Sequence, residues 1–112
     1  MGGLLILGGV LIAVTGVFGR LGKLRINHFA GFRTRTTMAS DEAWLAAHRA
    51  GGLPLAFGGV VVVALGLFAL AATDPDVFGP IAAIVVLAFV VPGAVLAQRA
   101  ARVVNETNGP AE

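Results

Sequence analysis

The stretch "LPLAFGGVVVVALGLFALAATDPDVFGPIAAIVVLAFVVPGAVLA", residues 53–97, contains two charge-free apolar segments on either side of the polar turn 74–76. A helix needs about 20 apolar residues to cross the hydrocarbon core of a bilayer, because each residue advances the helix by about 1.5 Å. The segments at about 53–73 and 77–98 both reach this length. They therefore predict two antiparallel transmembrane helices joined by a very short turn.

A third apolar segment, "GGLLILGGVLIAVTGVFG", occupies residues 2–19. It is at the short end of the range for a span, but Leu21 extends it if the Arg20 side chain reaches out to the membrane surface. The alternative is a cleaved signal peptide, which needs a basic region before the apolar stretch. Here the basic residues follow that stretch, so we predict a first span at about 2–21.

The composition agrees with a membrane protein. Hydrophobic residues make up 57% of the 112 residues, charged residues make up 12%, and the mean hydropathy is +0.90. A soluble domain carries about 25% charged residues, so this chain lacks a polar shell. It also lacks cysteine, which excludes disulfides, zinc–thiolate sites and thiol nucleophiles. We predict a single all-α membrane domain over residues 1–112.

The positive charges are distributed unequally. All eight Lys and Arg residues lie in or beside the connector at about 22–52, or in the tail 99–112, and the turn 74–76 has none. Under the positive-inside rule the connector and tail are cytoplasmic, so the N-terminus is outside and the C-terminus inside. This asymmetry explains the pI near 10.5 without a nucleic-acid partner.

Small residues recur along each span. In the first two spans glycines are spaced by seven residues, which favours close, shallow helix crossings in lipid. The residues that we expect to pack are Gly9, Ala13, Gly16, Gly52, Ala56, Gly59 and Gly66. In the third span the corresponding residues are Gly79, Ala83, Gly93, Ala97 and Ala100. These seams predict a packed bundle or a homo-oligomer.

The connector ends in "TMASDEAWLAAHRA", residues 37–50, which predicts a short amphipathic helix. Ser40 is a suitable N-cap, and the acidic pair 41–42 lies in the first turn, where the helix dipole favours negative charge. We expect this helix to lie at the membrane interface with Trp44 at headgroup depth. The Gly-Gly and Pro residues at 51–54 are expected to break it before the second span.

No catalytic, cofactor or metal site is expected. His28, His48 and one carboxylate are too few and too poorly spaced for zinc, so His48 should instead bond a backbone carbonyl or Asn27. Asp41 and Glu42 are adjacent at a helix start and diverge, which disfavours acid–base catalysis. The spans contain no ionisable residues, so ion transport is not indicated either.

The connector also carries a recognisable pattern. Its members are Asn27, Gly31-Phe32-Arg33-Thr34, Thr37, Ser40-Asp41-Glu42, Trp44 and His48-Arg49. The pattern resembles the signature of the SdpI family: an Asn, Gly-aromatic/Ile-Arg-Thr, a Thr or Ser, an acidic pair, Trp, and Asn or His before a basic residue. One span before this block and two after it also fit that family.

The resemblance implies a multi-pass protein of the bacterial cytoplasmic membrane. The founding member confers immunity to a secreted killing peptide and holds a transcriptional repressor at the membrane; this sequence has about half as many spans. The implied partners are the lipid bilayer, a peptide toxin and a cytoplasmic regulator. Arg33 is expected to hold Asp41 or Glu42, a lipid phosphate or a partner carboxylate, because guanidinium binds all three.

Two functions follow as hypotheses. In the first, the chain protects against or senses a membrane-active peptide, and residues 27–49 act as the signalling or docking element. In the second, it is an accessory subunit that joins a larger membrane complex through its glycine seams.

Overall fold

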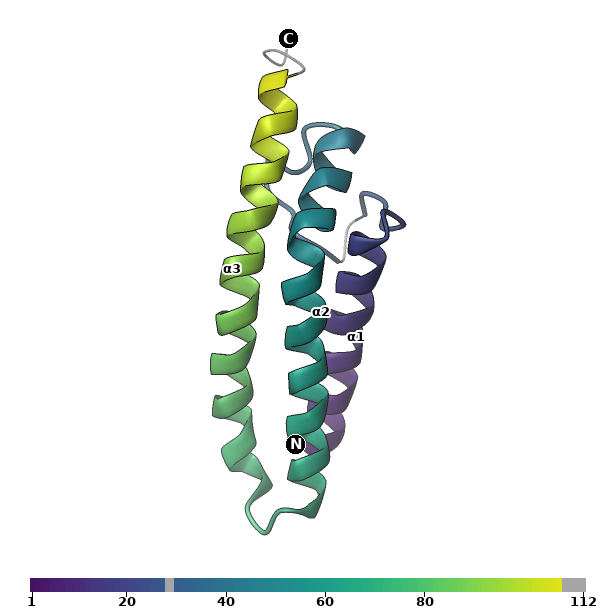
Figure 1. The fold of residues 1–112 in the computed structure, drawn as a ribbon. Helices are drawn as coiled ribbons and strands as arrows, with labels where there is room; N and C mark the ends of the chain where they lie inside the picture. Colours follow the sequence, from purple (N-terminus) through teal and green to yellow (C-terminus); the bar gives the residue numbers. More distant parts are fainter. Residues whose placement is uncertain (28–29, 108–112) are drawn as a thin grey trace.

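The computed structural model describes residues 1–27 and 30–107. Helix α1 spans Gly2–Arg20, α2 spans Asp41–Ala71, and α3 spans Phe78–Thr107 after the 3₁₀ turn Pro75–Val77 (Figure 1). All three helices are long and apolar enough to cross a membrane, and the described residues contain no strand. The predicted all-helical fold with three candidate spans is confirmed.

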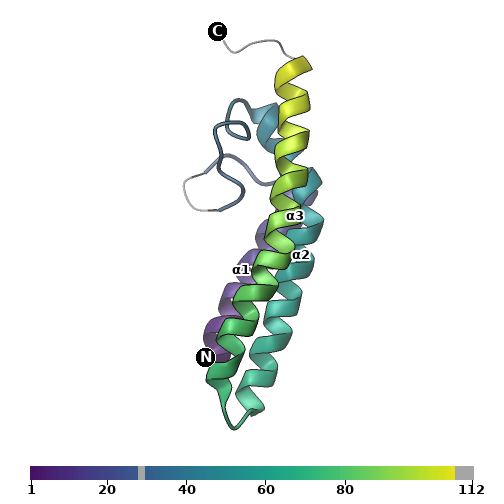
Figure 2. The same cartoon turned by 90° about the vertical axis from the view of Figure 1, so that its left-hand side faces the viewer.

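Helix α2 is the centre of the bundle. It lies between α1 and α3 and runs antiparallel to both, so the N-terminus and the turn between α2 and α3 share one end (Figures 1 and 2). Helices α1 and α3 pack along α2 and barely contact each other. The result is an elongated molecule of 57 × 21 × 20 Å, with an opening between its two outer helices.

The interface between α1 and α2 is built on opposed glycines. A Cβ atom on Gly9 would lie only 2.7 Å from the carbonyl oxygen of Gly59, and one on Gly59 would collide with the backbone nitrogen of Ala13. A Cβ on Gly16 would likewise collide with Ala56. The facing pairs are Gly2 with Gly66, Gly9 with Gly59, and Gly16 with Gly52. The two seven-residue series therefore meet within one chain, in antiparallel register.

The interface between α2 and α3 uses only part of the small-residue seam that the sequence suggested, since Gly93 and Ala97 are buried there. A Cβ on Gly51 would lie 2.7 Å from the carbonyl oxygen of Gly93, as a seam through Gly93 requires. However, α3 buries Ala82 and Ala101, whereas Ala83 is exposed and Ala100 half-buried. The expected seam is therefore wrong at Ala83 and Ala100. At both places the neighbouring alanine is the buried one, and neighbouring residues of a helix point about 100° apart.

The predicted helix break at 51–54 is also wrong, because α2 continues through these residues. Gly51 and Gly52 are buried where α3 and α1 approach α2 from either side. The glycines thus serve close packing of helices. Pro54 is inside α2; a proline within a membrane helix is tolerated when neighbouring elements compensate for the lost hydrogen bond.

Helix α2 is about 46 Å long and α3 about 45 Å, which exceeds the roughly 30 Å of a hydrocarbon core. Helix α3 continues to Thr107, where a short tail was expected from residue 99. The extra turns of both helices form one end of the molecule together with the connector. We call this end the polar cap, comprising residues 24–27, 30–50 and 97–107; residues 108–112 of the predicted tail lie outside the described residues.

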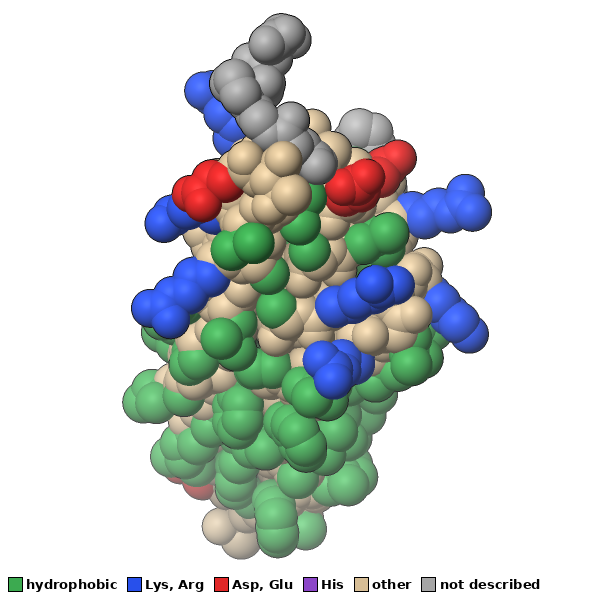
Figure 3. Space-filling view, turned by 45° about the horizontal axis from the view of Figure 1, so that its top comes forward, with side chains coloured by type: hydrophobic (Ala, Val, Ile, Leu, Met, Phe, Trp, Pro, Cys, Tyr) green, Lys and Arg blue, Asp and Glu red, His purple; other side chains and the backbone are tan. Residues whose placement is uncertain are grey.

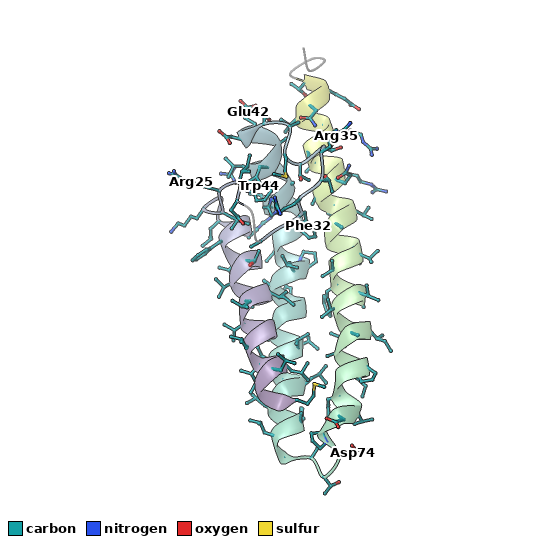
Figure 4. All side chains as sticks on the ribbon, turned by 180° about the vertical axis from the view of Figure 1, so that it is seen from behind. Arg25, Phe32, Arg35, Glu42, Trp44 and Asp74 are labelled. Carbon is teal, nitrogen blue, oxygen red and sulfur yellow. The ribbon has the colours of Figure 1, made fainter. Side chains whose placement is uncertain are left out.

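The Lys and Arg side chains gather at the polar cap, above an apolar surface (Figure 3). Asp74 lies at the opposite end of the bundle, and Arg25 and Arg35 lie at the cap (Figure 4). The structure thus separates a basic end from an acidic turn, as the three-span topology requires. Which end faces the cytoplasm stays a prediction from the positive-inside rule.

Candidate functional site

The polar cap has a small core between the start of α2 and the end of α3. Its centre consists of fully buried alanines, which let the helices approach closely: Ala43, Ala47, Ala97 and Ala101. Phe32 of the connector and Val104 of α3 pack against this cluster. Ser40 begins α2, and its side chain accepts a hydrogen bond from the N–H of Ala43 at 3.0 Å. The predicted N-cap is confirmed.

His48 fastens the connector to α2. Its Nε2 accepts a hydrogen bond from the backbone N–H of Phe32 at 2.7 Å, and its Nδ1 lies 2.8 Å from the carbonyl oxygen of Trp44. A backbone N–H is only a donor, so Nε2 must be unprotonated and Nδ1 must donate its proton to Trp44. Both ring nitrogens are therefore bonded to backbone groups, and the predicted bond to a backbone carbonyl is confirmed.

Gly31 makes room for this bond. Its φ is +102°, in the left-handed region that favours glycine, and a Cβ at this position would collide with Nε2 of His48. The position next to Phe32 therefore needs glycine both for backbone conformation and for space. This gives the Gly31–Phe32 pair of the motif a physical explanation.

Trp44 lies inside the protein, and only 1% of its surface is exposed. Its Nε1 donates a hydrogen bond to the carbonyl oxygen of Leu24 at 2.9 Å, and its ring packs on His48 with centroids 4.1 Å apart. The expectation that Trp44 anchors the chain by contact with the membrane interface is therefore wrong, because the indole is enclosed by protein; its depth in the membrane stays a prediction. The indole instead ties the chain leaving α1 to the start of α2.

Thr34 and Thr37 close a compact turn. The N–H of Thr34 bonds Oγ1 of Thr37 at 3.0 Å, and the N–H of Thr37 bonds Oγ1 of Thr34 at 3.1 Å. Thr37 is fully buried, and its hydroxyl donates to the carbonyl oxygen of Phe32 at 2.6 Å. The two backbone polar groups of Phe32 are thus held by two buried side chains, Thr37 and His48.

Asn27 shapes the other end of the connector. Its Oδ1 accepts a hydrogen bond from the N–H of Ala30 at 2.7 Å, and its Nδ2 donates to the carbonyl oxygen of Arg25 at 2.8 Å. Such a side chain substitutes for backbone partners in a turn. His28 lies outside the described residues.

The charged members of the motif lie at the surface of the protein. Arg33, Asp41, Glu42 and Arg49 are all exposed. The carbonyl oxygen of Arg49 accepts a hydrogen bond from Nη1 of Arg20 at 3.2 Å, which joins α1 to α2. The uncharged motif residues therefore build the connector, whereas the charged side chains lie on its surface.

Two polar residues of α3 were not singled out from the sequence. Thr34 donates its hydroxyl to Oε1 of Gln98 at 2.9 Å, and Nδ2 of Asn105 donates to the carbonyl oxygen of Thr36 at 3.0 Å. Gln98, Ala101 and Asn105 follow helical spacing and share one face of α3. This spacing could have predicted that residues 98–105 form a helix that packs on the rest of the protein.

A cavity of about 430 Å³ opens between α1 and α3 beneath the connector. Its lining includes Leu11 and Thr15 of α1, Leu55 of α2 and Val90 of α3. The connector closes its upper end with Ala30, Gly31 and Phe32. We call this cavity the groove; it is the place where all three helices and the connector meet.

A family model, the SdpI/YfhL protein family, matches residues 23–96, which include the connector, α2 and most of α3. The chain belongs to this family. The match confirms the resemblance carried by the connector motif. The comparisons with curated proteins and with solved structures gave no match.

Acidification is expected to destabilise the polar cap of this SdpI/YfhL family member. His48 precedes the apolar part of α2, and burial lowers its pKa from the usual 6.5, although the bond to Trp44 opposes this shift. The unfolded chain therefore takes up the proton first, and stability is lost as the pH falls below about 6.5. Protonated Nε2 would also point a proton at the N–H of Phe32.

The measurement is the thermal midpoint in detergent between pH 7.5 and 5.5, a range chosen around the unperturbed histidine pKa. A His48→Asn variant should have a lower midpoint that depends less on pH. His28→Gln is the matched control and should retain the wild-type dependence. An unchanged pH profile in His48→Asn would show that another group titrates.

Proposed function

We propose that this protein protects a bacterial cytoplasmic membrane against a membrane-active peptide, or senses that peptide, with the connector as the reporting element. The observation that carries the proposal is the groove, because its apolar wall comes from three candidate spans and its end comes from Phe32. A peptide that inserts an apolar face there would contact the connector directly. The N-terminus would be outside and the polar cap in the cytoplasm.

Phe32 is the link in this mechanism. Its side chain lines the groove, while its N–H and C=O are bonded to His48 and Thr37 inside the cap. A ligand that displaces the backbone of Phe32 along with its ring would bend or break one of these bonds. The connector would then adopt a second arrangement, in which this bond is broken. A ligand favours that arrangement only if it binds it more tightly than the first.

Arg33 is the residue through which the connector would meet a cytoplasmic partner. It follows Phe32 directly and is exposed, so a change at Phe32 alters where the guanidinium lies. A guanidinium binds carboxylates in a bidentate manner, which suits an acidic surface on a regulator.

Arg33→Ala is expected to abolish most of the protection while leaving insertion and thermal stability nearly unchanged, because an exposed side chain contributes little to folding. The assay is survival of a sensitive bacterial strain exposed to the killing peptide that the family's founding member neutralises, with and without expression of this protein. Arg35→Ala removes the same charge two residues away and should still protect. If Arg33→Ala protects as well as the wild type and Arg35→Ala do, the Arg33 side chain has no role in protection, and the proposed reporting role of the connector is contradicted.

A second experiment distinguishes the accessory-subunit alternative. The protein is purified in nanodiscs at native expression, and co-purifying molecules are identified by mass spectrometry. A short peptide or a cytoplasmic regulator supports the sensing role. A large membrane complex in fixed stoichiometry would replace it with the accessory role.

A further inference from the structure

A second cavity, of about 710 Å³, lies between the connector and α3. Residues 31–34 form one wall, and α3 from Val90 to Arg102 contributes the other. The groove and this cavity share Gly31, Phe32 and Val90. The two cavities therefore meet at Phe32, and their linings differ in chemistry.

The lining of the second cavity changes from apolar to cationic along α3. Val91 and Val95 lie on the membrane side, and Gln98 and Arg102 continue the same face of the helix toward the cap. Arg99 and, from the connector, Arg33 complete a set of three arginines. None of the described residues that line this cavity is acidic.

The position of this change matches the edge of a bilayer. From Phe78 to Ala97 the helix runs for 20 residues without a charge, which is about 30 Å and equals the hydrocarbon thickness. Gln98 and Arg99 thus lie at headgroup level when that segment spans the membrane. The valines lie in the acyl-chain region.

We propose that this cavity binds one anionic phospholipid, with its phosphate on Arg99 and Arg102 of α3 and an acyl chain along Val91 and Val95. Guanidinium groups bind phosphate through paired, charge-assisted hydrogen bonds. Basic pockets beside membrane helices on the cytoplasmic side are suited to anionic headgroups. The same arginines repel a cationic peptide, so this cavity and the groove are expected to bind different ligands.

The bound lipid would also join the connector to α3, since the two cavity walls come from these two elements. Thr34 and Gln98 already bridge the walls by a hydrogen bond of 2.9 Å. Lipid binding should therefore raise the thermal midpoint of the full chain. This inference does not depend on the proposed function, because binding is measured without a toxin or regulator.

The test uses purified full-length protein in a neutral detergent, with dioleoyl phosphatidylglycerol and dioleoyl phosphatidylcholine as probes. Native mass spectrometry and the thermal midpoint report binding. We expect one retained phosphatidylglycerol, a raised midpoint, and a preference of about tenfold or more over phosphatidylcholine. Inorganic phosphate and soluble glycerol phosphate should give no rise, because they lack the acyl chain.

Two variants locate the site. Arg99→Gln/Arg102→Gln should reduce the preference by about tenfold, whereas Lys23→Gln/Arg25→Gln removes the same charge from residues outside this cavity and should leave it nearly intact. Ala94→Phe fills the apolar half without changing charge and should also weaken retention, which keeps the test decisive if the double variant fails to fold. Equal retention of both lipids, or equal loss in both charge variants, would overturn the proposal.

Discussion

Gly9→Leu is expected to separate α1 from α2 and to lower the free energy of unfolding by about 3 kcal/mol, the upper range for forcing extra volume into a packed interface. A Cβ at residue 9 already lies 2.7 Å from the carbonyl oxygen of Gly59 and 2.7 Å from the backbone nitrogen of Val63. These obstacles are backbone atoms of a long helix, so they cannot rotate away. The measurement is thermal or denaturant unfolding in micelles.

Gly8→Leu is the matched control, because a Cβ at residue 8 meets no atom within 4 Å. It adds the same side chain to the same helix one residue earlier and should change stability by less than about 0.5 kcal/mol. Equal destabilisation by both variants would mean that leucine acts through local helix propensity or insertion. The α1–α2 glycine contact would then not be a major source of stability.

The glycine period identified the packing faces but could not identify their partner. A seven-residue series in one span is compatible with a neighbour in the same chain, a second copy or another protein. In the structure the series of α1 meets that of α2, so Gly16 faces Gly52 within one chain. A homo-oligomer or larger complex would have to use other faces, such as the exposed side of α1 around Leu4 and Leu7.

Residues 51–54 illustrate why a helix break was expected where none exists. Glycine and proline both disfavour a helix when only local propensity is considered. Gly51 and Gly52 instead supply contact surfaces for α3 and α1, and this tertiary advantage outweighs the local cost. A single sequence shows the propensity of a residue but not which neighbour lies beside it.

At the end of α3 the error was the reverse one: a solvated tail was expected where the helix continues and packs on α2. Charged residues such as Arg99 and Arg102 suggested a solvated tail. Yet Ala97, Ala101 and Val104 follow a helical period, and they bury a face against α2. Alanine side chains give only a weak hydrophobic signal. The buried face of this segment was therefore not recognised between the arginines.

The connector motif could be recognised from the sequence, but the tasks of its residues could not. Polarity alone does not reveal that His48 and Thr37 satisfy the backbone of one residue, Phe32. Such a pairing depends on which backbone groups the fold removes from water. The charged residues of the motif are all exposed, so we expect a partner to be recognised through them.

Trp44→Ala should destabilise the protein by about 3–5 kcal/mol, the usual cost of truncating a buried large aromatic side chain. The indole is 1% exposed, packs on the His48 ring, and donates a hydrogen bond to Leu24. Its removal leaves a cavity between α2 and the chain that follows α1. The measurement is unfolding in micelles, with Phe57→Ala as control, because Phe57 is an aromatic residue of the same helix with 61% exposure.

Fluorescence provides an independent check, since Trp44 is the only tryptophan. A buried indole should emit at short wavelength and should be quenched weakly both by aqueous acrylamide and by brominated lipids. An anchor at headgroup depth would respond strongly to shallow brominated lipids. Strong shallow quenching together with a mild effect of Trp44→Ala would place the indole at the membrane surface and refute its role as the internal tie between α2 and the connector.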